Sequence, residues 1–126
     1  MTIKQILVID DEPYVREVIQ ICLETTAGWE VITAGSGNEG LVKAETEQPD
    51  AILLDVMMPG MNGITTFQNL QSNAATQEIP VIVLTAKMQF GDRPQYLKLG
   101  LKAAIAKPFD PLTLASEIAQ VLDWDL

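Results

Sequence analysis

The stretch ILVIDDEPYV, residues 6–15, places an aliphatic run directly before three consecutive carboxylates, Asp10, Asp11 and Glu12. An aliphatic run without polar alternation is typical of a parallel strand that is covered on both faces. Pro13 follows at a position where a helix can begin, because the first helical residue needs no N–H donor. The stretch therefore predicts a buried strand, an acidic turn and then a helix.

The same pattern recurs along the chain. Residues 51–54 and 81–84 form two further aliphatic runs, and weaker strands are expected at 30–34 and 103–106, the last at a sheet edge because its side chains are small. The segments between these runs carry apolar residues at helical spacing. Alternating strands and helices with short connections predict an α/β fold, in which helices cover both faces of a parallel sheet.

Two helix starts can be read from capping residues. Asp92 is expected to cap a short helix that ends at Gly100, and Asp110 is expected to cap the last helix, with Pro111 as its first residue. In open parallel sheets, ligands bind beyond the carboxyl ends of the strands, so the residues that follow each strand are the candidates for function.

Composition limits the classes of function. The 126 residues carry a net charge of −9, which argues against direct binding to nucleic acid or to an anionic membrane surface. Cys22 is the single cysteine, and the chain opens without a long apolar leader. We expect one domain over residues 1–126 and a soluble, cytoplasmic protein.

Acidic residues end two of the expected central strands. Asp10 and Asp11 follow the first and Asp55 ends the third, while Thr85 and Lys107 follow the fourth and fifth. Two unit charges about 4 Å apart interact by about 4 kcal/mol at an effective dielectric constant near 20, so clustered carboxylates need cations. Lys107 supplies one positive charge. Magnesium, with manganese as a substitute, is the expected further cation, because it prefers oxygen ligands and the chain has no histidine.

The motifs VIDDEP, LLDVMMPGMNG, VLTA and AKPF, in this order, resemble those of the receiver domain of two-component response regulators, over essentially the whole chain. The resemblance implies a three-layer αβα sandwich with a five-stranded parallel sheet in the flavodoxin-like order 2-1-3-4-5. It also implies a cis peptide bond between Lys107 and Pro108. Gly63 and Pro59 are similar to the residues that turn the chain from strand to helix in this family.

The resemblance also assigns roles. Asp55 is implied as the phosphoacceptor, with Thr85 and Lys107 contacting the phosphoryl oxygens. The magnesium ligands are implied to be Asp10, Asp11, Asp55 and the backbone carbonyl of Met57. A sensor histidine kinase or a histidine phosphotransfer protein is the implied phosphodonor, and the fourth helix, fifth strand and fifth helix form the implied face for a downstream target. Such a domain carries out its own phosphorylation and dephosphorylation but is not otherwise an enzyme.

Three other interpretations remain open at this point. Residues 35–40, GSGNEG, match a dinucleotide-binding fingerprint between a strand and a helix. A magnesium-dependent aspartyl-phosphate hydrolase would use similar chemistry, although it requires an aspartate at position 12, where this chain has Glu12. Receivers usually carry an aromatic residue where this chain has Ala104, so a binding module that works without phosphorylation is the third. If phosphorylation does control output, the segment 85–92 and the short fourth helix are the expected moving parts.

Overall fold

The computed structural model describes residues 3–58, 60–85 and 92–125. Strands and helices alternate along the chain as the sequence predicts: β1 (Gln5–Ile9), α1 (Pro13–Ala27), β2 (Glu30–Ala34), α2 (Gly37–Glu47), β3 (Ala51–Asp55), α3 (Gly63–Ser72), β4 (Val81–Thr85), α4 (Asp92–Leu99), β5 (Ala103–Ala106) and α5 (Leu114–Leu122).

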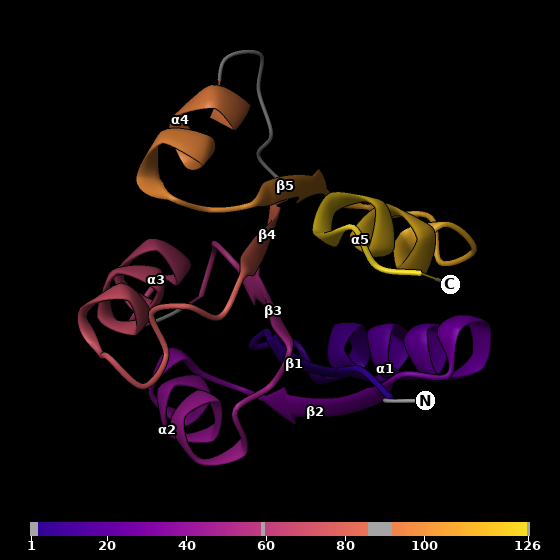
Figure 1. Ribbon diagram of the computed structural model, residues 1–126, viewed down its shortest axis with the longest axis horizontal. Coiled ribbons are helices and arrows are strands. Elements are labelled where there is room, and N and C mark those ends of the chain that lie inside the picture. Colours follow the sequence, from indigo (N-terminus) through magenta and orange to yellow (C-terminus); the bar gives the residue numbers. More distant parts are fainter. Residues whose placement is uncertain (1–2, 59, 86–91, 126) are drawn as a thin grey trace.

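The sheet is entirely parallel, and its strand order is β2-β1-β3-β4-β5. Helices α1 and α5 cover one face, and α2, α3 and α4 cover the other (Figure 1). The three-layer sandwich and the order 2-1-3-4-5 are therefore confirmed. The alanine-rich strand β5 lies at an edge, as its small side chains predict.

Each face of the sheet buries its own apolar cluster. Ile6 and Val8 of β1 pack toward α1 and α5, whereas Leu7 and Ile9 pack toward α2 and α3. All four side chains are completely buried, as expected for a central strand whose successive residues point to opposite faces. This burial fixes the end of β1, and with it the position of Asp10.

Glycines follow two of the helices, as the sequence predicts for Gly100, whereas two predicted helix starts are wrong: α4 begins at Asp92 itself, which was expected to precede it as the cap. Gly28 ends α1 in the left-handed region, at φ 69°, and Gly100 follows α4 with φ 107°. The predicted start of α5 at Pro111 is wrong, because α5 begins at Leu114 with Thr113 as its N-cap. The side chain of Asp110 instead accepts a hydrogen bond from the N–H of Leu112, at 2.9 Å, which forms a turn before the helix.

An aromatic cluster lies at the amino ends of the strands. Trp124 packs edge-to-face on Trp29, with ring centroids 5.3 Å apart, and the amine of Lys4 lies 4.9 Å from the centre of the Trp124 ring. Lys4 directly precedes β1 and Trp29 directly precedes β2. The C-terminal segment is therefore attached to the end of the sheet that is opposite Asp10.

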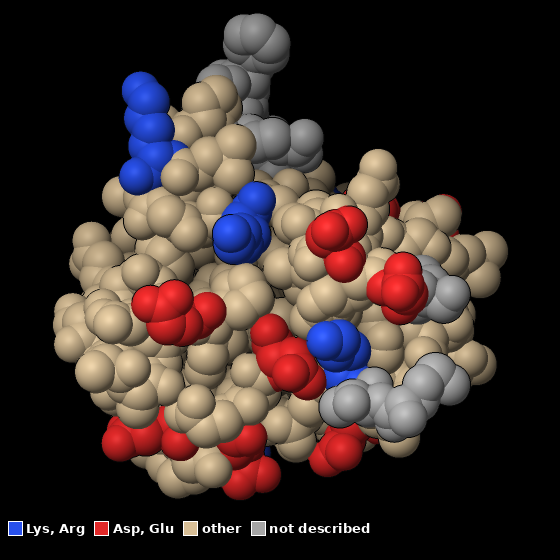
Figure 2. Space-filling model, in the orientation of Figure 1, with Lys and Arg blue, Asp and Glu red and all other residues tan. Residues whose placement is uncertain are grey.

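The surface agrees with the negative net charge. Figure 2 shows acidic side chains spread over the face that is turned toward the viewer, with fewer basic side chains among them. None of the helices in the described ranges combines the length and the apolar character that crossing a membrane requires.

Candidate functional site

Three carboxylates come together at the carboxyl ends of β1 and β3. Asp10 and Asp11 follow β1, Asp55 is the last residue of the neighbouring β3, and oxygen atoms of the three side chains lie within 4.8 Å of one another. Asp10 is completely buried and Asp55 is 3% exposed, whereas Asp11 is half-buried. The structure thus brings together the three aspartates that the sequence singles out.

Lys107 reaches this cluster from the end of β5. Its amine donates to Asp10 Oδ2 at 2.8 Å and lies 3.4 Å from Asp55 Oδ1. The N–H of Lys107 donates to the carbonyl oxygen of Thr85 at 2.8 Å, which fixes the lysine beside the end of β4. Its peptide bond to Pro108 is cis.

Backbone N–H groups hold the two buried carboxylates in place. The N–H of Glu12 donates to Asp10 Oδ1 at 2.9 Å, and the N–H of Met57 donates to Asp55 Oδ1 at 3.2 Å. The oxygen atoms of both aspartates are thus oriented by the turns that follow β1 and β3. Glu12 is itself exposed and is not a member of the carboxylate cluster.

The electrostatic environment keeps Asp55 from ionising freely. Burial raises the pKa of its carboxyl from 3.8 to about 6, and the charge of Asp10 adds to this shift, while Lys107 and the N–H of Met57 act in the opposite direction. Burial by itself would lower the pKa of Lys107, but hydrogen bonds and charges from Asp10 and Asp55 outweigh it, so the pKa is raised from 10.5. The ammonium group of Lys107 thus forms ion pairs with both buried aspartates.

The donor set fits a hard divalent cation. Lys107 contacts two of the three carboxylates, and within the described residues Asp11 forms no ion pair, so negative charge is left at a partly buried position. Carboxylate oxygens are the ligands that magnesium and manganese take in proteins, and the chain has no histidine that would favour zinc. The arrangement is therefore suited chemically to a magnesium-type ion.

Thr85 and Met57 complete the set of predicted site residues. Thr85 is the last residue of β4 and is 1% exposed, so it lies at the same end of the sheet as Asp55. The side chain of Met57 is 53% exposed and points away from the core. Pro59, and residues 86–91 of the segment expected to move, lie outside the described residues.

Gly63 supports the end of β3 by close packing. A Cβ atom at position 63 would lie 2.3 Å from the backbone oxygen of Asp55, and the N–H of Gly63 donates to the carbonyl of Val56 at 2.9 Å. Any larger residue at the first position of α3 would therefore have to displace the main chain of Asp55. The turning role predicted for Gly63 thus has a steric cause.

The dinucleotide interpretation of residues 35–40 is not needed, because the glycines have packing roles. A Cβ atom on Gly37 would lie 2.3 Å from Thr66 Oγ1, and one on Gly40 would lie 2.4 Å from Ile9 Cδ1. These glycines let α2 pack closely against α3 and β1. Ser36 caps α2 by accepting from the N–H of Glu39 at 3.1 Å.

Arg16 is a member of the site that the sequence did not reveal. Its guanidinium donates to the backbone oxygen of Asp10 at 2.7 Å. Arg16 lies in the first turns of α1, where the helix dipole disfavours a cation. A basic residue in this unfavourable position of the sequence indicates that its side chain has a specific partner.

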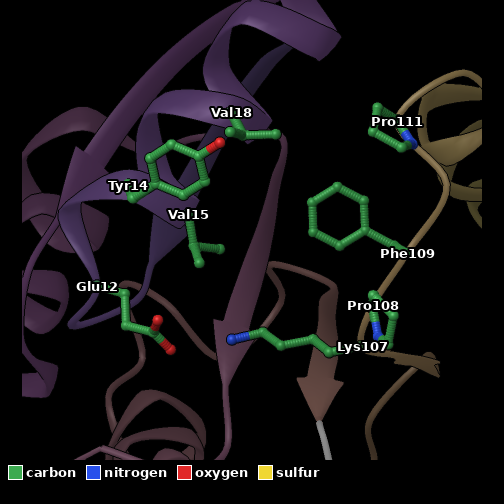
Figure 3. A pocket seen from close by; sticks show the side chains of 8 residues that line it. All are labelled: Glu12, Tyr14, Val15, Val18, Lys107, Pro108, Phe109 and Pro111. Carbon is green, nitrogen blue, oxygen red and sulfur yellow. The ribbon is translucent and has the colours of Figure 1, made fainter.

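A pocket of about 360 Å³ adjoins the site on the side of α1 (Figure 3). The ring of Phe109 lies opposite Val15 and Val18, and Glu12 and Lys107 lie together at one end of the pocket. Apolar side chains thus continue directly from Lys107 onto the surface of α1. The complete lining is Glu12, Tyr14, Val15, Val18, Lys107, Pro108, Phe109 and Pro111.

Solved structures share this architecture. Chemotaxis response regulator CheY4 of Vibrio cholerae superposes with a TM-score of 0.87 at 30% identity, over 95% of this chain and 99% of that one. A putative response regulator from Chloroflexus aurantiacus superposes with a TM-score of 0.86, also at 30% identity, over 97% of this chain and 99% of that one.

Sequence comparisons agree with the structural ones. Alkaline phosphatase synthesis transcriptional regulatory protein PhoP of Bacillus subtilis is 40% identical over 94% of this chain and 48% of its own length. Phosphate regulon transcriptional regulatory protein PhoB of Pseudomonas aeruginosa is 39% identical over 94% of this chain and 52% of its own length. The chain spans about half the length of these relatives. The family model of the response regulator receiver domain matches residues 6–119, and the chain therefore belongs to this family of signalling domains.

Proposed function

We propose that this receiver domain accepts a phosphoryl group on Asp55 in a magnesium-dependent reaction. The observation that carries the proposal is the meeting of Asp10, Asp11 and Asp55 at neighbouring strand ends, with Lys107 in contact with both buried acids. This arrangement leaves one carboxylate beside a cation and next to a group of oxygen ligands. It fits phosphoryl transfer, in which charge neutralisation and positioning do most of the work.

The proposed ligands of the ion are Asp10, Asp11, Asp55 and the backbone carbonyl of Met57. Magnesium, or manganese in its place, supplies positive charge for the phosphoryl oxygens when it is bound. Lys107 supplies a second positive charge, and Thr85 supplies a hydroxyl at the end of the adjacent strand. The pKa of Asp55 is raised in the protein without metal, and the charge of a bound ion would lower it and so maintain the nucleophilic carboxylate.

The proposed donor is a phosphohistidine on a sensor kinase or a phosphotransfer protein. A carboxylate oxygen of Asp55 attacks phosphorus, the bond between phosphorus and the histidine nitrogen breaks, and the imidazole leaves with the bonding electrons. Lys107 lies in both the site and the pocket of Figure 3, so a partner that delivers its histidine to Asp55 would cover that pocket. Tyr14, at 77% exposed, would contribute to the same contact.

A downstream target is proposed to bind the face formed by α4, β5 and α5. A groove of about 240 Å³ runs along the edge strand there, and Leu97 and Val121 expose apolar surface beside it. The groove residues are Leu97, Lys102, Ala103, Ala104, Ile105, Glu117, Gln120 and Val121. Small side chains at Ala103 and Ala104 leave room for the side chains of a partner.

Intact mass spectrometry tests the central proposal. Incubation with a small-molecule phosphodonor and magnesium should add one phosphoryl group to the wild-type protein. Asp55→Asn is nearly isosteric and should add none, and chelation of magnesium should abolish the gain. Equal phosphorylation of Asp55→Asn would refute the assignment of Asp55.

A further inference from the structure

The backbone of Asp10 is bound as fully as its side chain. Its N–H donates to the carbonyl of Ala34 at 3.1 Å, and its carbonyl accepts from Arg16 Nη1 at 2.7 Å. The residue therefore has a fixed partner for each of its polar backbone groups, and Lys107 and Glu12 bind its two carboxylate oxygens.

The carbonyl that Arg16 binds belongs to the peptide group between Asp10 and Asp11. Fixing this group restricts the backbone dihedral angles on either side of it, and these angles set the directions of both side chains. A hydrogen bond from a charged donor is about twice as strong as a neutral one. Arg16 is thus placed to control how two of the three clustered carboxylates are presented.

Arg16 is in turn held from its other side. A Cβ atom on Gly35 would lie 3.1 Å from Arg16 Nη1, so the guanidinium packs directly over this glycine. Glu39 accepts from the N–H of Gly35 at 2.8 Å and pairs with Lys43 at 3.0 Å. The guanidinium therefore packs against the turn between β2 and α2. These contacts join the acidic site to a part of the chain that contributes no ligand to it.

We propose that Arg16 is a positioning residue for the magnesium site, which orients Asp10 and Asp11 through the peptide group between them. The inference rests on the magnesium site proposed above. Groups that orient metal ligands typically change metal affinity by about 10-fold or more when they are removed. The positioning effect of Arg16 and the effect of its charge predict opposite changes in magnesium affinity when the residue is removed. Loss of a nearby cation would by itself tighten magnesium binding, whereas loss of ligand orientation would weaken it.

The test uses calorimetric titration of magnesium into the metal-free protein and into Arg16→Ala. The variant should bind magnesium about 10-fold more weakly. The amide nitrogen of Asp11 should also shift in the NMR spectrum of the metal-free variant, because Arg16 polarises the carbonyl to which that nitrogen is bonded. This signal requires neither metal nor phosphorylation.

Lys43→Ala is the matched control. Lys43 belongs to the same group of contacts and donates to the backbone oxygen of Thr33, but it does not contact Asp10. The control should leave magnesium affinity and the Asp11 signal unchanged. If Arg16→Ala does not fold, Arg16→Gln decides, because it keeps a long polar side chain on α1 but removes the charged donor, and it should weaken magnesium binding in the same direction.

Unchanged or tighter magnesium binding by Arg16→Ala would overturn the inference. An equal loss in Lys43→Ala would also overturn it, because the effect would then be general to this region. Failure of the wild-type protein to bind magnesium would instead refute the proposed metal site, so the two outcomes can be told apart.

Discussion

Lys107 and Asp10 form an ion pair of 2.8 Å although 97 residues separate them in the chain, and the side chain of Asp10 is completely buried. Removing one partner of a buried ion pair lowers the stability of a protein more than removing one partner of an exposed pair, because the remaining buried charge is left uncompensated. This pair therefore links the stability of the domain to its proposed chemistry.

Replacing Lys107 with methionine should destabilise the metal-free protein. Asp10 and Asp55 would lose the ammonium group that they both contact, and the expected loss is about 3 kcal/mol in the free energy of unfolding. Saturating magnesium should restore part of this loss by binding the folded state. Urea unfolding with and without magnesium measures both effects. Lys102→Met, at an exposed position, is the control and should match the wild-type protein both with and without magnesium.

The contribution of Asp55 to the stability of the metal-free protein should fall as pH rises from about 4 to above 6. The pKa of Asp55 is about 6 in the folded protein and 3.8 when unperturbed, so the folded state binds more protons across this window. The contribution of Asp55 is complete below pH 3.8 and is lost as pH rises through 6. It amounts to about 2 to 3 kcal/mol, since each pKa unit corresponds to about 1.4 kcal/mol.

Comparison with Asp55→Asn isolates this contribution. Thermal unfolding in the presence of a chelator, from pH 4 to pH 8, should show a smaller decline for the variant over the same window. The same pH dependence in both proteins would show that the proton is bound elsewhere.

Gly63→Ala should impair phosphorylation of Asp55. The added methyl group would lie 2.3 Å from the backbone oxygen of Asp55, so the end of β3 must move. Gly37→Ala is a matched control, because Gly37 also begins a helix and its added methyl group would meet the side chain of Thr66, at 2.3 Å from Oγ1, and not the backbone of Asp55. Both variants should lose about 1 to 3 kcal/mol of stability. Intact mass over time should show slower phosphorylation in Gly63→Ala alone.

Phosphorylation should alter amide exchange across residues 85–105. Ala104 is 4% exposed and packs in the apolar cluster beside α4, so no aromatic side chain at this position can report the state of the site. Helix α4 is largely exposed, with Leu97 and Leu99 about half exposed, and segments with little burial open most readily. Exchange measured with and without a phosphate mimic tests this, and identical rates would contradict it.

Binding of the downstream target distinguishes phosphorylation control from a permanent binding module. If the switch operates, the phosphorylated protein should bind its target more tightly than Asp55→Asn does. Equal affinity in the two, together with normal folding, would favour the phosphorylation-independent module that Ala104 suggests.

The sequence was most informative where one physical requirement dominates. The central strands were found because burial on both faces demands uninterrupted aliphatic residues, and the acids at their ends were found because parallel strands bring their carboxyl ends together. The edge strand β5 followed from its small residues. The start of α5 was misplaced because Asp110 and Pro111 suit both a turn and a helix start, and contacts decide between them.

Arg16 escaped sequence analysis for a different reason. Its place in the first turns of α1 indicates that it has a partner, but that partner is a backbone carbonyl, which every residue possesses, so the sequence does not identify it. The packing of Gly63 on Asp55 was similarly invisible, because only the fold sets the distance between a helix start and a strand end.

Trp124 packs on Trp29 beside Lys4, so the C-terminal segment lies at one pole of the molecule, at the amino ends of the strands, and the carboxylates lie at the opposite pole. The chain enters and leaves at one pole, where Figure 1 shows both termini on the same side of the view, and the carboxylates occupy the other. The five residues of β1 separate these poles by about 17 Å. Whatever is fused to either terminus, a tag or another polypeptide, can therefore be accommodated without obstructing a histidine that approaches Asp55.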